Sequence, residues 1–463
     1  MDVRKKGNVN YIMRIVIVGD GKVGNILMRQ LSKEGHDIVI IDNKTEVIER
    51  TLNSYDIMAI EGNGANYFIQ KQAGVDKADL LIAATSSDEL NMLSCMVAKK
   101  LGVKYAVSRV RNPEYSEQIY LMRDELGIDM VINPEFTAAQ EISRILRFPT
   151  ALRVETFTRG KAELVEIKIQ ENSKLDGQSL SSLAMKFQVK ILVCAVQRNS
   201  EIFIPTGEFV LKAGDKISIT ATAGEILQFF KRAGILMNKI KSVMIVGGSR
   251  IGFYLSKMLS ESGMDIQLLE LNKDKCLKLS EELPKATIIH GDGTNHDLLL
   301  EMGIESTDAF VSLTNIDEEN IILSMYAMKK EVPKVITKVN KLSFTKLLDN
   351  DMADGVISPK YLTANQIVSY VRGLENTVGC NVQSLHRIIG NQVEVLEFAI
   401  QVMEDFIDVP LKVLRIKENI LIACIIRNNK TIIPGGDDTI QVGDNVIVVT
   451  SIPFLQDFSD IFK

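Results

Sequence analysis

Two glycine-rich turns carry the residues whose types and spacing best suit ligand chemistry in this sequence. In a G-x-G-x-x-G turn, the first glycine permits a tight bend, the second lets a pyrophosphate approach the backbone, and the third lets the next helix pack against the strand. The helix N-terminus then presents unpaired N–H groups and a positive dipole to the phosphates. The first turn follows the apolar run 15–18 and comprises Gly19, Asp20, Gly21, Lys22, Val23 and Gly24. This spacing predicts a phosphate-binding turn between a strand and a helix.

An acidic residue follows where a dinucleotide-binding unit needs one. After an amphipathic segment with Leu27 and Leu31 on one face, the apolar run 38–41 ends on Asp42, which lies 42 − 24 = 18 residues past the last glycine. A carboxylate about 20 residues on hydrogen-bonds a ribose 2′-OH. It also repels a 2′-phosphate, so the sequence favours NAD(H) over NADP(H), although Lys44 weakens that exclusion. The alternative is a glycine turn that merely connects a strand to a helix.

Polar residues also follow three further predicted strands of the same unit, at Asn63, at Thr85 with Ser86, and at Arg109. In a doubly wound sheet the ligand lies beyond the carboxyl ends of the strands, so we expect these residues on the edge that carries the turn. Thr85 and Ser86 are candidates for bonds to a phosphate or to the second ribose. Arg109 supplies a fixed cation for the pyrophosphate or for an acid of a neighbouring subunit. The alternatives are that Thr85 only caps the next helix and that Arg109 is a solvated strand end.

The whole pattern returns in the second half of the chain at a nearly constant offset. The turn at 19 returns at 247 (247 − 19 = 228), and the segment 62–66 returns at 291 (291 − 62 = 229). Outside these segments, Ile204-Pro205 returns as Ile433-Pro434, again at 229. A nearly constant offset across the chain indicates tandem duplication of a two-lobe unit. The second candidate site therefore comprises Gly247, Gly248, Ser249, Arg250, Ile251, Glu270, Thr314 and Lys338.

The second copy departs from the first at two of these positions. Ser249 stands where Gly21 stands, so a side chain intrudes where the pyrophosphate approaches most closely. Lys338 replaces Arg109, which keeps the charge but loses the bidentate fork. Glu270 keeps the ribose-reading carboxylate. The sequence leaves open whether the second site binds NAD(H), a different nucleotide, or NAD(H) more weakly.

Alternating strands and helices predict the α/β class, with doubly wound, parallel-sheet lobes of the Rossmann type. After 151 the strands become short and are joined by turns, with one short helical stretch at 180–187. This pattern predicts a small α+β lobe after each Rossmann-like lobe. The predicted order is a flexible leader (1–12), a first Rossmann-like lobe (13–135), an exit or crossover helix (136–150), a small lobe (151–236), a second Rossmann-like lobe (241–360), a second crossover helix (361–384) and a second small lobe (385–463).

Composition narrows the function classes. The formal charge is −5 and no basic tract stands out, which argues against nucleic acid as a partner. The longest apolar runs are far shorter than the roughly 20 residues of a spanning helix. No signal peptide is visible, and the five cysteines lack C-x-x-C spacing. These features predict a soluble cytoplasmic protein with reduced thiols.

No catalytic or metal-binding cluster is predicted. His290 and His296 flank Asp292, but their spacing suits neither a helical pair nor a zinc turn. His36 and His386 have no partner motif and are predicted to lie at the surface. A duplicated nucleotide-binding unit without visible catalysts indicates a regulator and not an enzyme. The alternatives are an NAD-dependent oxidoreductase with an unrecognised substrate lobe and a structural assembly protein without nucleotide affinity.

Three segments resemble the RCK (KTN) nucleotide-binding domain, namely 19–24, 85–89 and 108–113. The lobe 151–236 looks like the C-terminal lobe that accompanies this domain. The tandem order of four lobes from Met13 onward is similar to that of the peripheral subunits of Trk-type potassium-uptake systems.

The resemblance implies a cytoplasmic regulator, peripheral on the inner face of the cell membrane. Such a regulator gates a Trk-type potassium-translocating membrane subunit as a homo-oligomeric ring, expected to be a tetramer. It implies NAD(H) at the first site, formed by 19–23, Asp42, Thr85, Ser86 and Arg109. It implies NAD(H) or an adenine nucleotide (ATP or ADP) at the second, formed by 247–251, Glu270, Thr314 and Lys338. The helices predicted at 136–146 and 361–372 are the candidates for the lever and the subunit contact.

Overall fold

The computed structural model confirms the predicted α/β class and the duplicated architecture. It divides into two compact units, one of Met1–Glu135 with Lys360–Val371 and one of Phe136–Pro359 with Arg372–Lys463. Most of the predicted leader, and Cys380, lie outside the described residues. The structure describes residues 12–148, 151–157, 161–199, 201–235, 239–341, 353–375, 381–389, 392–452, 455 and 457–463.

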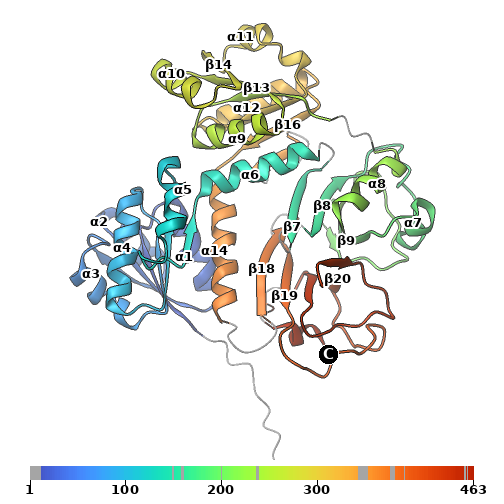
Figure 1. Ribbon diagram of the computed structural model, residues 1–463, viewed down its shortest axis with the longest axis horizontal. Coiled ribbons are helices and arrows are strands. Elements are labelled where there is room, and N and C mark those ends of the chain that lie inside the picture. Colours follow the sequence, from blue (N-terminus) through green and yellow to red (C-terminus); the bar gives the residue numbers. More distant parts are fainter. Residues whose placement is uncertain are drawn as a thin grey trace, which may run out of the picture. The chain divides into compact units, whose positions relative to one another are not determined.

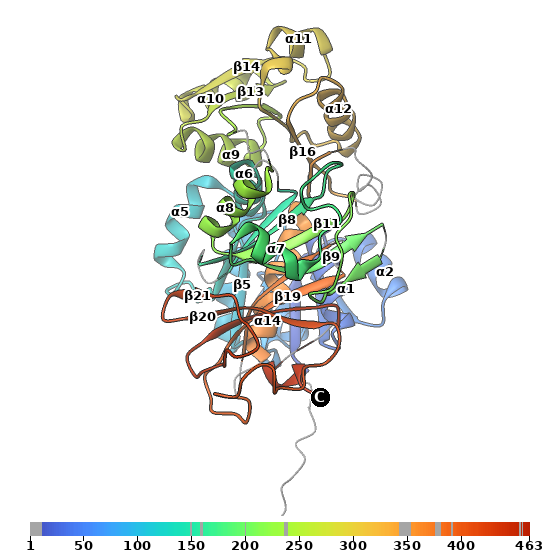
Figure 2. The ribbon, with the colours of Figure 1, turned by 90° about the vertical axis from the view of Figure 1, so that its right-hand side faces the viewer.

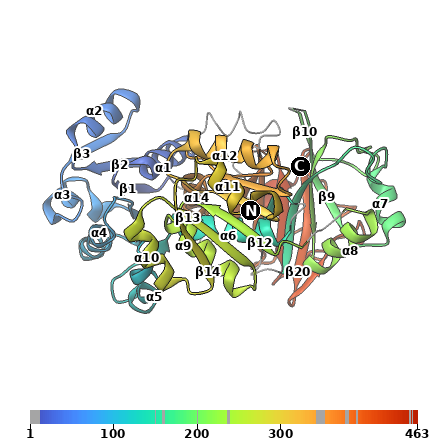
Figure 3. The ribbon, with the colours of Figure 1, turned by 90° about the horizontal axis from the view of Figure 1, so that it is seen from above.

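The first Rossmann-like lobe, here called the first N-lobe, is built on a six-stranded parallel sheet with the order β3-β2-β1-β4-β5-β6. The chain order reverses between β1 and β4, so the crevice in which such sheets bind ligands lies beyond the carboxyl ends of these two strands. Figure 3 shows β1, β2 and β3 side by side, with α1 next to β1. The strands are β1 (Arg14–Val18), β2 (Asp37–Asp42), β3 (Met58–Glu61), β4 (Leu80–Ala83), β5 (Tyr105–Arg109) and β6 (Met130–Ile132).

The central strands form because their apolar residues are continuous and both faces are covered. Ile15, Val16 and Ile17 of β1 are completely buried, as expected for a parallel strand between helical layers. Helix α1 turns Leu27 and Leu31 inward, and Gly35, at φ +90°, takes the left-handed conformation that follows the end of the helix. The helices are α1 (Lys22–Lys33), α2 (Thr45–Ser54), α3 (Tyr67–Gln72), α4 (Asp88–Leu101) and α5 (Pro113–Met122).

The second N-lobe repeats this sheet with the order β14-β13-β12-β15-β16-β17. The repeated strand order shows that the constant sequence offset reflects a duplicated fold. Its strands are β12 (Ser242–Val246), β13 (Asp265–Glu270), β14 (Ala286–His290), β15 (Ala309–Ser312), β16 (Lys334–Lys338) and β17 (Gly355–Ile357). Its described helices of more than one turn are α9 (Arg250–Glu261), α10 (Lys273–Glu282), α11 (His296–Glu301) and α12 (Asp317–Lys329).

Each of the two small lobes, here called C-lobes, contains a five-stranded antiparallel sheet. The strand orders are β10-β9-β11-β8-β7 in the first and β18-β19-β22-β20-β21 in the second. The first has strands β7 (Arg153–Phe157), β8 (Ala162–Lys168), β9 (Leu192–Arg198), β10 (Glu201–Phe203) and β11 (Lys216–Ala221), with helices α7 (Leu180–Phe187) and α8 (Ala223–Ala233). The second has β18 (Asn381–Ile388), β19 (Val393–Ala399), β20 (Ile420–Arg427), β21 (Lys430–Ile432) and β22 (Asn445–Thr450).

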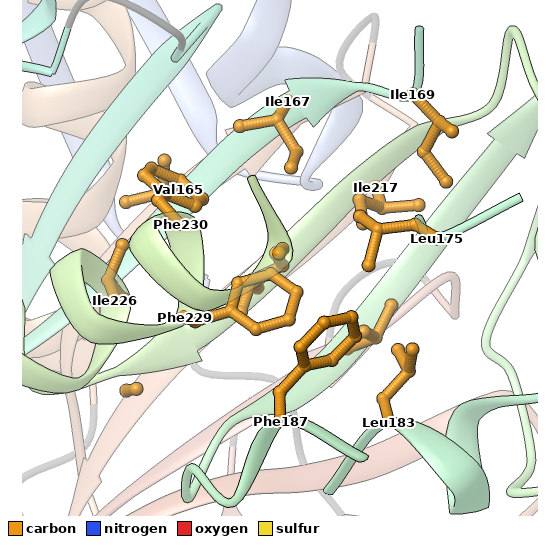
Figure 4. Packing of buried hydrophobic residues seen from close by; sticks show 14 of the residues in the cluster. Val165, Ile167, Ile169, Leu175, Leu183, Phe187, Ile217, Ile226, Phe229 and Phe230 are labelled. Carbon is orange, nitrogen blue, oxygen red and sulfur yellow. The ribbon is translucent and has the colours of Figure 1, made fainter. Parts of the chain in front are cut away.

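Helices α7 and α8 cover one face of the first C-lobe sheet (Figure 2). The rings of Phe187 and Phe229 meet edge to face at 5.5 Å, and Phe230 and Ile226 point to the same core (Figure 4). The sequence predicted α7 but missed α8, whose apolar residues recur at helical spacing after the N-cap Thr222.

The two crossover helices are exchanged between the compact units. Helix α6 (Pro134–Arg147), which follows the first sheet, belongs almost entirely to the second unit, where Phe136 contacts the ring of Tyr254 on α9 at 5.3 Å. Helix α14 (Pro359–Glu375; Figure 1) follows the second sheet, yet residues 360–371 belong to the first unit. Ile367 and Val368 in this segment are buried. Each N-lobe is therefore covered by the helix that leaves the other.

The two C-lobe sheets share a buried cluster that includes Phe157, Cys194 and Cys424. His386 lies at this contact, with its Nδ1 2.7 Å from the Glu155 carboxylate and its ring against Phe157. The prediction of a surface position was wrong for His36, which is 7% exposed and accepts a bond from the Met13 N–H. His386 is half-buried, with its side chain 25% exposed. Both contacts join residues far apart in the sequence, so a local motif search does not reveal them.

Gly214-Asp215 of the first C-lobe returns as Gly443-Asp444 in the second, and the aspartate of each pair has a structural role. The buried Asp215 carboxylate accepts bonds from Arg198 Nε and Nη2, both at 2.8 Å, and from the Lys212 N–H. Asp444 accepts the same pair of bonds from Arg427. Each carboxylate fixes a turn to the neighbouring strand β9 or β20.

We expect Asp215→Ala to lower the free energy of unfolding by about 2–4 kcal/mol, because it leaves a partly buried guanidinium without its carboxylate. Urea denaturation followed by far-UV circular dichroism measures the change. The control is Asp437→Ala, which removes an exposed pair with Lys412 and should leave the midpoint unchanged. Equal midpoints for the two variants would contradict a structural role for Asp215.

Candidate nucleotide-binding sites

The first glycine turn has the backbone geometry that a bound phosphate requires. Gly19, at φ +96°, donates its N–H to the Ile41 carbonyl at 2.8 Å, which ties the turn to the end of β2. A Cβ on Gly24 would lie 1.9 Å from the Gly19 carbonyl oxygen, so α1 can approach β1 only with glycine there. A Cβ on Gly21 would meet nothing within 4 Å. Gly21 is the N-cap of α1, and the first N–H groups of the helix have no side-chain cap.

Asp42 lies beside this turn at the end of β2. Its Oδ2 accepts the Asp20 N–H at 2.8 Å, and its Oδ1 accepts the Lys44 N–H at 3.0 Å. The carboxylate is half-buried, so its remaining lone pairs are available to ribose hydroxyls next to the phosphate position. The predicted acid and the predicted turn are therefore in contact.

The side chain of Asp20 points away from the ligand edge. It is 1% exposed and accepts bonds from the Thr51 hydroxyl and, at 3.3 Å, from Asn25 Nδ2. Burial raises the pKa of the Asp20 carboxyl, against the lowering effect of these hydrogen bonds. Asp20 thus supports the turn from behind, and Val23, also buried, packs into the core.

The structure brings Asn63 and Thr85 to the same edge as the glycine turn. Asn63 Oδ1 accepts the Ala65 N–H at 2.9 Å and so shapes the loop after β3. A Cβ on Gly64 would lie 2.0 Å from Val18 Cγ1, which places this loop against the end of β1. Thr85 abuts Gly19, because a Cβ on Gly19 would lie 3.1 Å from Thr85 atoms.

The Thr85 hydroxyl is already engaged within the protein. It donates to Asn91 Oδ1 at 2.7 Å and accepts the Ser87 N–H at 3.3 Å. Its one hydrogen is used, so a ligand meets it through a lone pair, which suits a ribose hydroxyl better than a phosphate. The cap of α4 is Ser87, whose Oγ accepts the Leu90 N–H, and not Thr85.

Ser86 is exposed, and its carbonyl accepts a bond from Arg111. Arg109 is half-buried at the end of β5, beside the loop that carries Thr85. The side chain of Asn91 joins Thr85 to Arg109, and the sequence did not lead us to predict this role. The available signal was the spacing Thr-x-x-Asp-x-x-Asn, which occurs at 85–91 and again at 314–320.

The second site repeats the turn and the acid. Gly247 has φ +106°, and a Cβ on Gly252 would lie 2.5 Å from the Gly247 carbonyl oxygen. Glu270 accepts the Gly248 and Asn272 N–H groups, both at 2.9 Å, as Asp42 does in the first copy. The turn geometry is therefore conserved between the two halves of the chain.

The charged groups of the second site are paired internally. Lys275 Nζ lies 2.8 Å from Glu270 Oε2, whereas Val47 occupies the matching position (275 − 228 = 47) in the first copy. Burial raises the pKa of Glu270, but the bonds from Lys275 and from backbone N–H groups outweigh it and hold this pKa below its usual value. Lys338 is 5% exposed, and its Nζ donates to the Leu313 carbonyl at 3.3 Å.

Ser249 caps the helix where Gly21 leaves it open. Its Oγ accepts the Gly252 N–H at 3.4 Å, so it takes a donor that an anion would use. Arg250 begins α9, Ile251 is buried in the core, and the Thr314 hydroxyl donates to the Ile316 carbonyl at 3.1 Å. The second turn therefore has the fold of the first with fewer open donors.

Neither metal chemistry nor a spanning helix is indicated by the described part of the chain. His290 Nε2 is 3.1 Å from the Leu271 carbonyl oxygen, and His296 stacks on Tyr326 at 4.0 Å. Within the described residues, the structure groups no three metal-ligating side chains. No helix among them has the length and apolar character needed to cross a bilayer.

The fold and the two glycine turns define a tandem pair of Rossmann-type units, each followed by a small antiparallel lobe. Residues 15–134 and 243–359 match the TrkA-N domain, and residues 164–234 and 395–463 match the TrkA-C domain. The Trk system potassium uptake protein TrkA homolog of Archaeoglobus fulgidus is 33% identical over 452 residues, which cover 97% of this chain and 100% of the relative. The chain belongs to the TrkA family of Trk system potassium uptake proteins.

Solved structures show the same fold at low identity. The chain is similar to the crystal structure of the GsuK RCK domain, with a TM-score of 0.63, 17% identity and coverage of 95% of this chain and 93% of that one. It is also similar to the GsuK channel bound to NAD, with a TM-score of 0.64, 16% identity and coverage of 96% and 77%. These likenesses agree with the predicted RCK-type fold.

We expect Gly24→Ala and Gly21→Ala to differ sharply in stability. Gly24→Ala forces α1 away from the Gly19 carbonyl and should lower the melting temperature by several degrees, because the overlap is with backbone atoms. Gly21→Ala adds a Cβ in open space at an ordinary φ of −70° and should leave the melting temperature within about one degree. Equal shifts in a thermal melt would contradict the described turn.

Proposed function

We propose that this protein is a nucleotide-sensing regulatory subunit that binds NAD(H) at its first site and gates a Trk-type potassium-translocating membrane subunit from the cytoplasmic face. The observation that carries the proposal is the uncapped N-terminus of α1 at Gly21, with the Asp42 carboxylate beside it. The N–H groups of α1 are the donors for a pyrophosphate, and the Asp42 carboxylate next to them is the acceptor for the ribose hydroxyls.

The charge of Asp42 and the open space at Gly21 both favour NAD(H) as the ligand of the first site. Asp42 ends β2 with lone pairs for a ribose 2′-OH, and a 2′-phosphate would place negative charge against it. The open volume at Gly21 accepts a phosphate where Ser249 fills the second turn. NAD(H) is therefore the ligand of the first site, with Thr85, Ser86 and Arg109 beyond the pyrophosphate.

Sensing, and not redox turnover, is supported by what surrounds the first site. In the described part of the first unit, Asp20 is committed to Thr51 and Asn25, and Thr85 to Asn91, so neither offers an acid or base to a substrate. The structural neighbour bound to NAD is the GsuK channel, and the Archaeoglobus fulgidus relative is named for potassium uptake. Steady oxidation of NADH in the presence of small carbonyl compounds would support an oxidoreductase instead.

Assembly into a ring is supported by exposed apolar side chains at matching positions of the two N-lobes. Leu93 and Met96 on α4 are exposed, and Ile322 and Met325 on α12 lie 229 residues later with similar exposure. Leu121 on α5 is 85% exposed. Such helix faces fit a second copy of the chain, and several sites in one ring sum their coupling energies, each about 1–3 kcal/mol.

We expect Asp42→Ala to weaken NADH binding about 10- to 100-fold, because it removes charge-assisted hydrogen bonds to the ribose. Isothermal titration of the purified chain measures the dissociation constant. Asp37→Ala is the matched control, since it makes the same charge change at the other end of β2 on an exposed side chain. The first site is misplaced if the wild type and the two variants bind NADH equally.

The second site is proposed to bind NAD(H) or an adenine nucleotide (ATP or ADP) more weakly, because Ser249 and Lys275 occupy its donors and its acid. We expect Ser249→Gly with Lys275→Val to raise the NADH bound per chain from one to two at concentrations that saturate the first site. The control pairs Ser249→Gly with Lys273→Val, a neighbouring exposed lysine on the same helix. Unchanged stoichiometry in the first double variant would contradict this explanation.

A further inference from the structure

A buried asparagine joins two strand ends at the ligand edge of the first N-lobe. Asn91 lies in the first turns of α4 and is 0% exposed. Its Oδ1 accepts the Thr85 N–H at 2.8 Å and the Thr85 hydroxyl at 2.7 Å. Its Nδ2 donates to the Thr85 carbonyl at 3.3 Å and to the Arg109 carbonyl at 2.9 Å. All four hydrogen-bonding capacities of the amide are therefore used.

The position of these bonds matters because the strand ladder stops just before them. The last pair between β4 and β5 is Ala83 with Ser108, so Thr85 and Arg109 lie beyond the paired region of these two strands. Strands that separate at the carboxyl edge expose unpaired carbonyl and N–H groups, which must find partners when buried. Asn91 supplies them from α4 and holds the two chain segments together.

Asp88 extends the same link along the next segment. Its Oδ2 accepts the Arg111 N–H at 2.9 Å and the Asn112 N–H at 2.8 Å. One turn of α4 therefore fixes the backbone from Arg109 to Asn112. The backbone of Thr85 and that of Arg109 are set by one rigid helix, which favours a fixed distance between the two candidate ligand groups.

The second copy contains the same link with one difference. Asn320 accepts the Thr314 N–H at 2.8 Å and donates to the Lys338 carbonyl at 3.0 Å. Asp317 accepts the Asn340 and Lys341 N–H groups, both at 2.9 Å. The Thr314 hydroxyl, however, bonds to Ile316 and not to Asn320. The amide link is thus common to both copies, and the hydroxyl contact is specific to the first.

We infer that Asn91 is a positioning residue of the nucleotide site, which holds the loop after β4 and the end of β5 together so that Thr85 and Arg109 meet the dinucleotide at a fixed separation. This assignment rests on the proposed function of the first site. In this role Asn91 does not touch the ligand and acts through Thr85 and Arg109.

The test compares Asn91→Asp with Asp79→Ala in the full chain, with NADH as the ligand. Asn91→Asp keeps the acceptors for Thr85 but replaces both donors with a charge that faces the Thr85 and Arg109 carbonyls. Asp79 joins the starts of β1 and β5 at the opposite edge of the same sheet, through the Arg14 N–H at 3.0 Å and Lys104 at 2.8 Å. Both changes weaken a link between strands, but only the first lies at the ligand edge.

We expect Asn91→Asp to raise the NADH dissociation constant at least tenfold, and Asp79→Ala to leave it within twofold while lowering the melting temperature by a similar amount. Equal effects of the two variants on affinity, or wild-type affinity for Asn91→Asp, would overturn the assignment alone. Absence of NADH binding by the wild type would overturn the proposed function and this assignment with it.

A second measurement covers the case in which Asn91→Asp does not fold. Hydrogen exchange of the wild type should slow on NADH binding at 84–92 and 109–112 together, because the same helix holds both segments. Slowing at 19–24 without any change in these two segments would overturn the assignment.

Discussion

The close approach of α1 to β1 at Gly24 is the constraint on which the first site depends. Because a Cβ there would collide with the Gly19 carbonyl, glycine alone lets the helix begin directly above the end of the strand. That placement aims the free N–H groups of the helix at the crevice between β1 and β4. Asp42, the loop after β3 and the loop after β4 then lie around the same turn, because parallel strands end at the same edge of the sheet.

Duplication explains why the chain contains this arrangement twice, and the differences between the copies explain why they are not equivalent. Gly252 preserves the close approach of α9 to β12, so the second fold is retained. Ser249 accepts the Gly252 N–H that the first copy leaves without a side-chain cap, and the Glu270 carboxylate is paired with Lys275. A fold can therefore keep its backbone geometry while its polar side chains bond within the protein, and for this reason NAD(H) is proposed for the first site and weaker binding for the second.

The parts of this structure that could be predicted from the sequence are those that local patterns determine. Continuous apolar runs, glycine spacing and a constant offset were enough to predict both parallel sheets, the first turn and an acid at the end of β2. The contacts that could not be predicted join residues distant in sequence: the bond of Asn91 to Arg109, the contact of His386 with Glu155, and the exchange of α6 and α14 between the compact units. Each depends on where a whole element packs, and no local spacing specifies that.

The central claim is that the turn at Gly21 and the acid at Asp42 capture a dinucleotide for signalling. A crystal structure of the chain grown with NADH tests it most directly. We expect the pyrophosphate to lie against the N-terminus of α1 and the adenine ribose hydroxyls to lie on the Asp42 carboxylate. A first N-lobe that stays empty at saturating NADH, or a dinucleotide bound elsewhere on the chain, would contradict it.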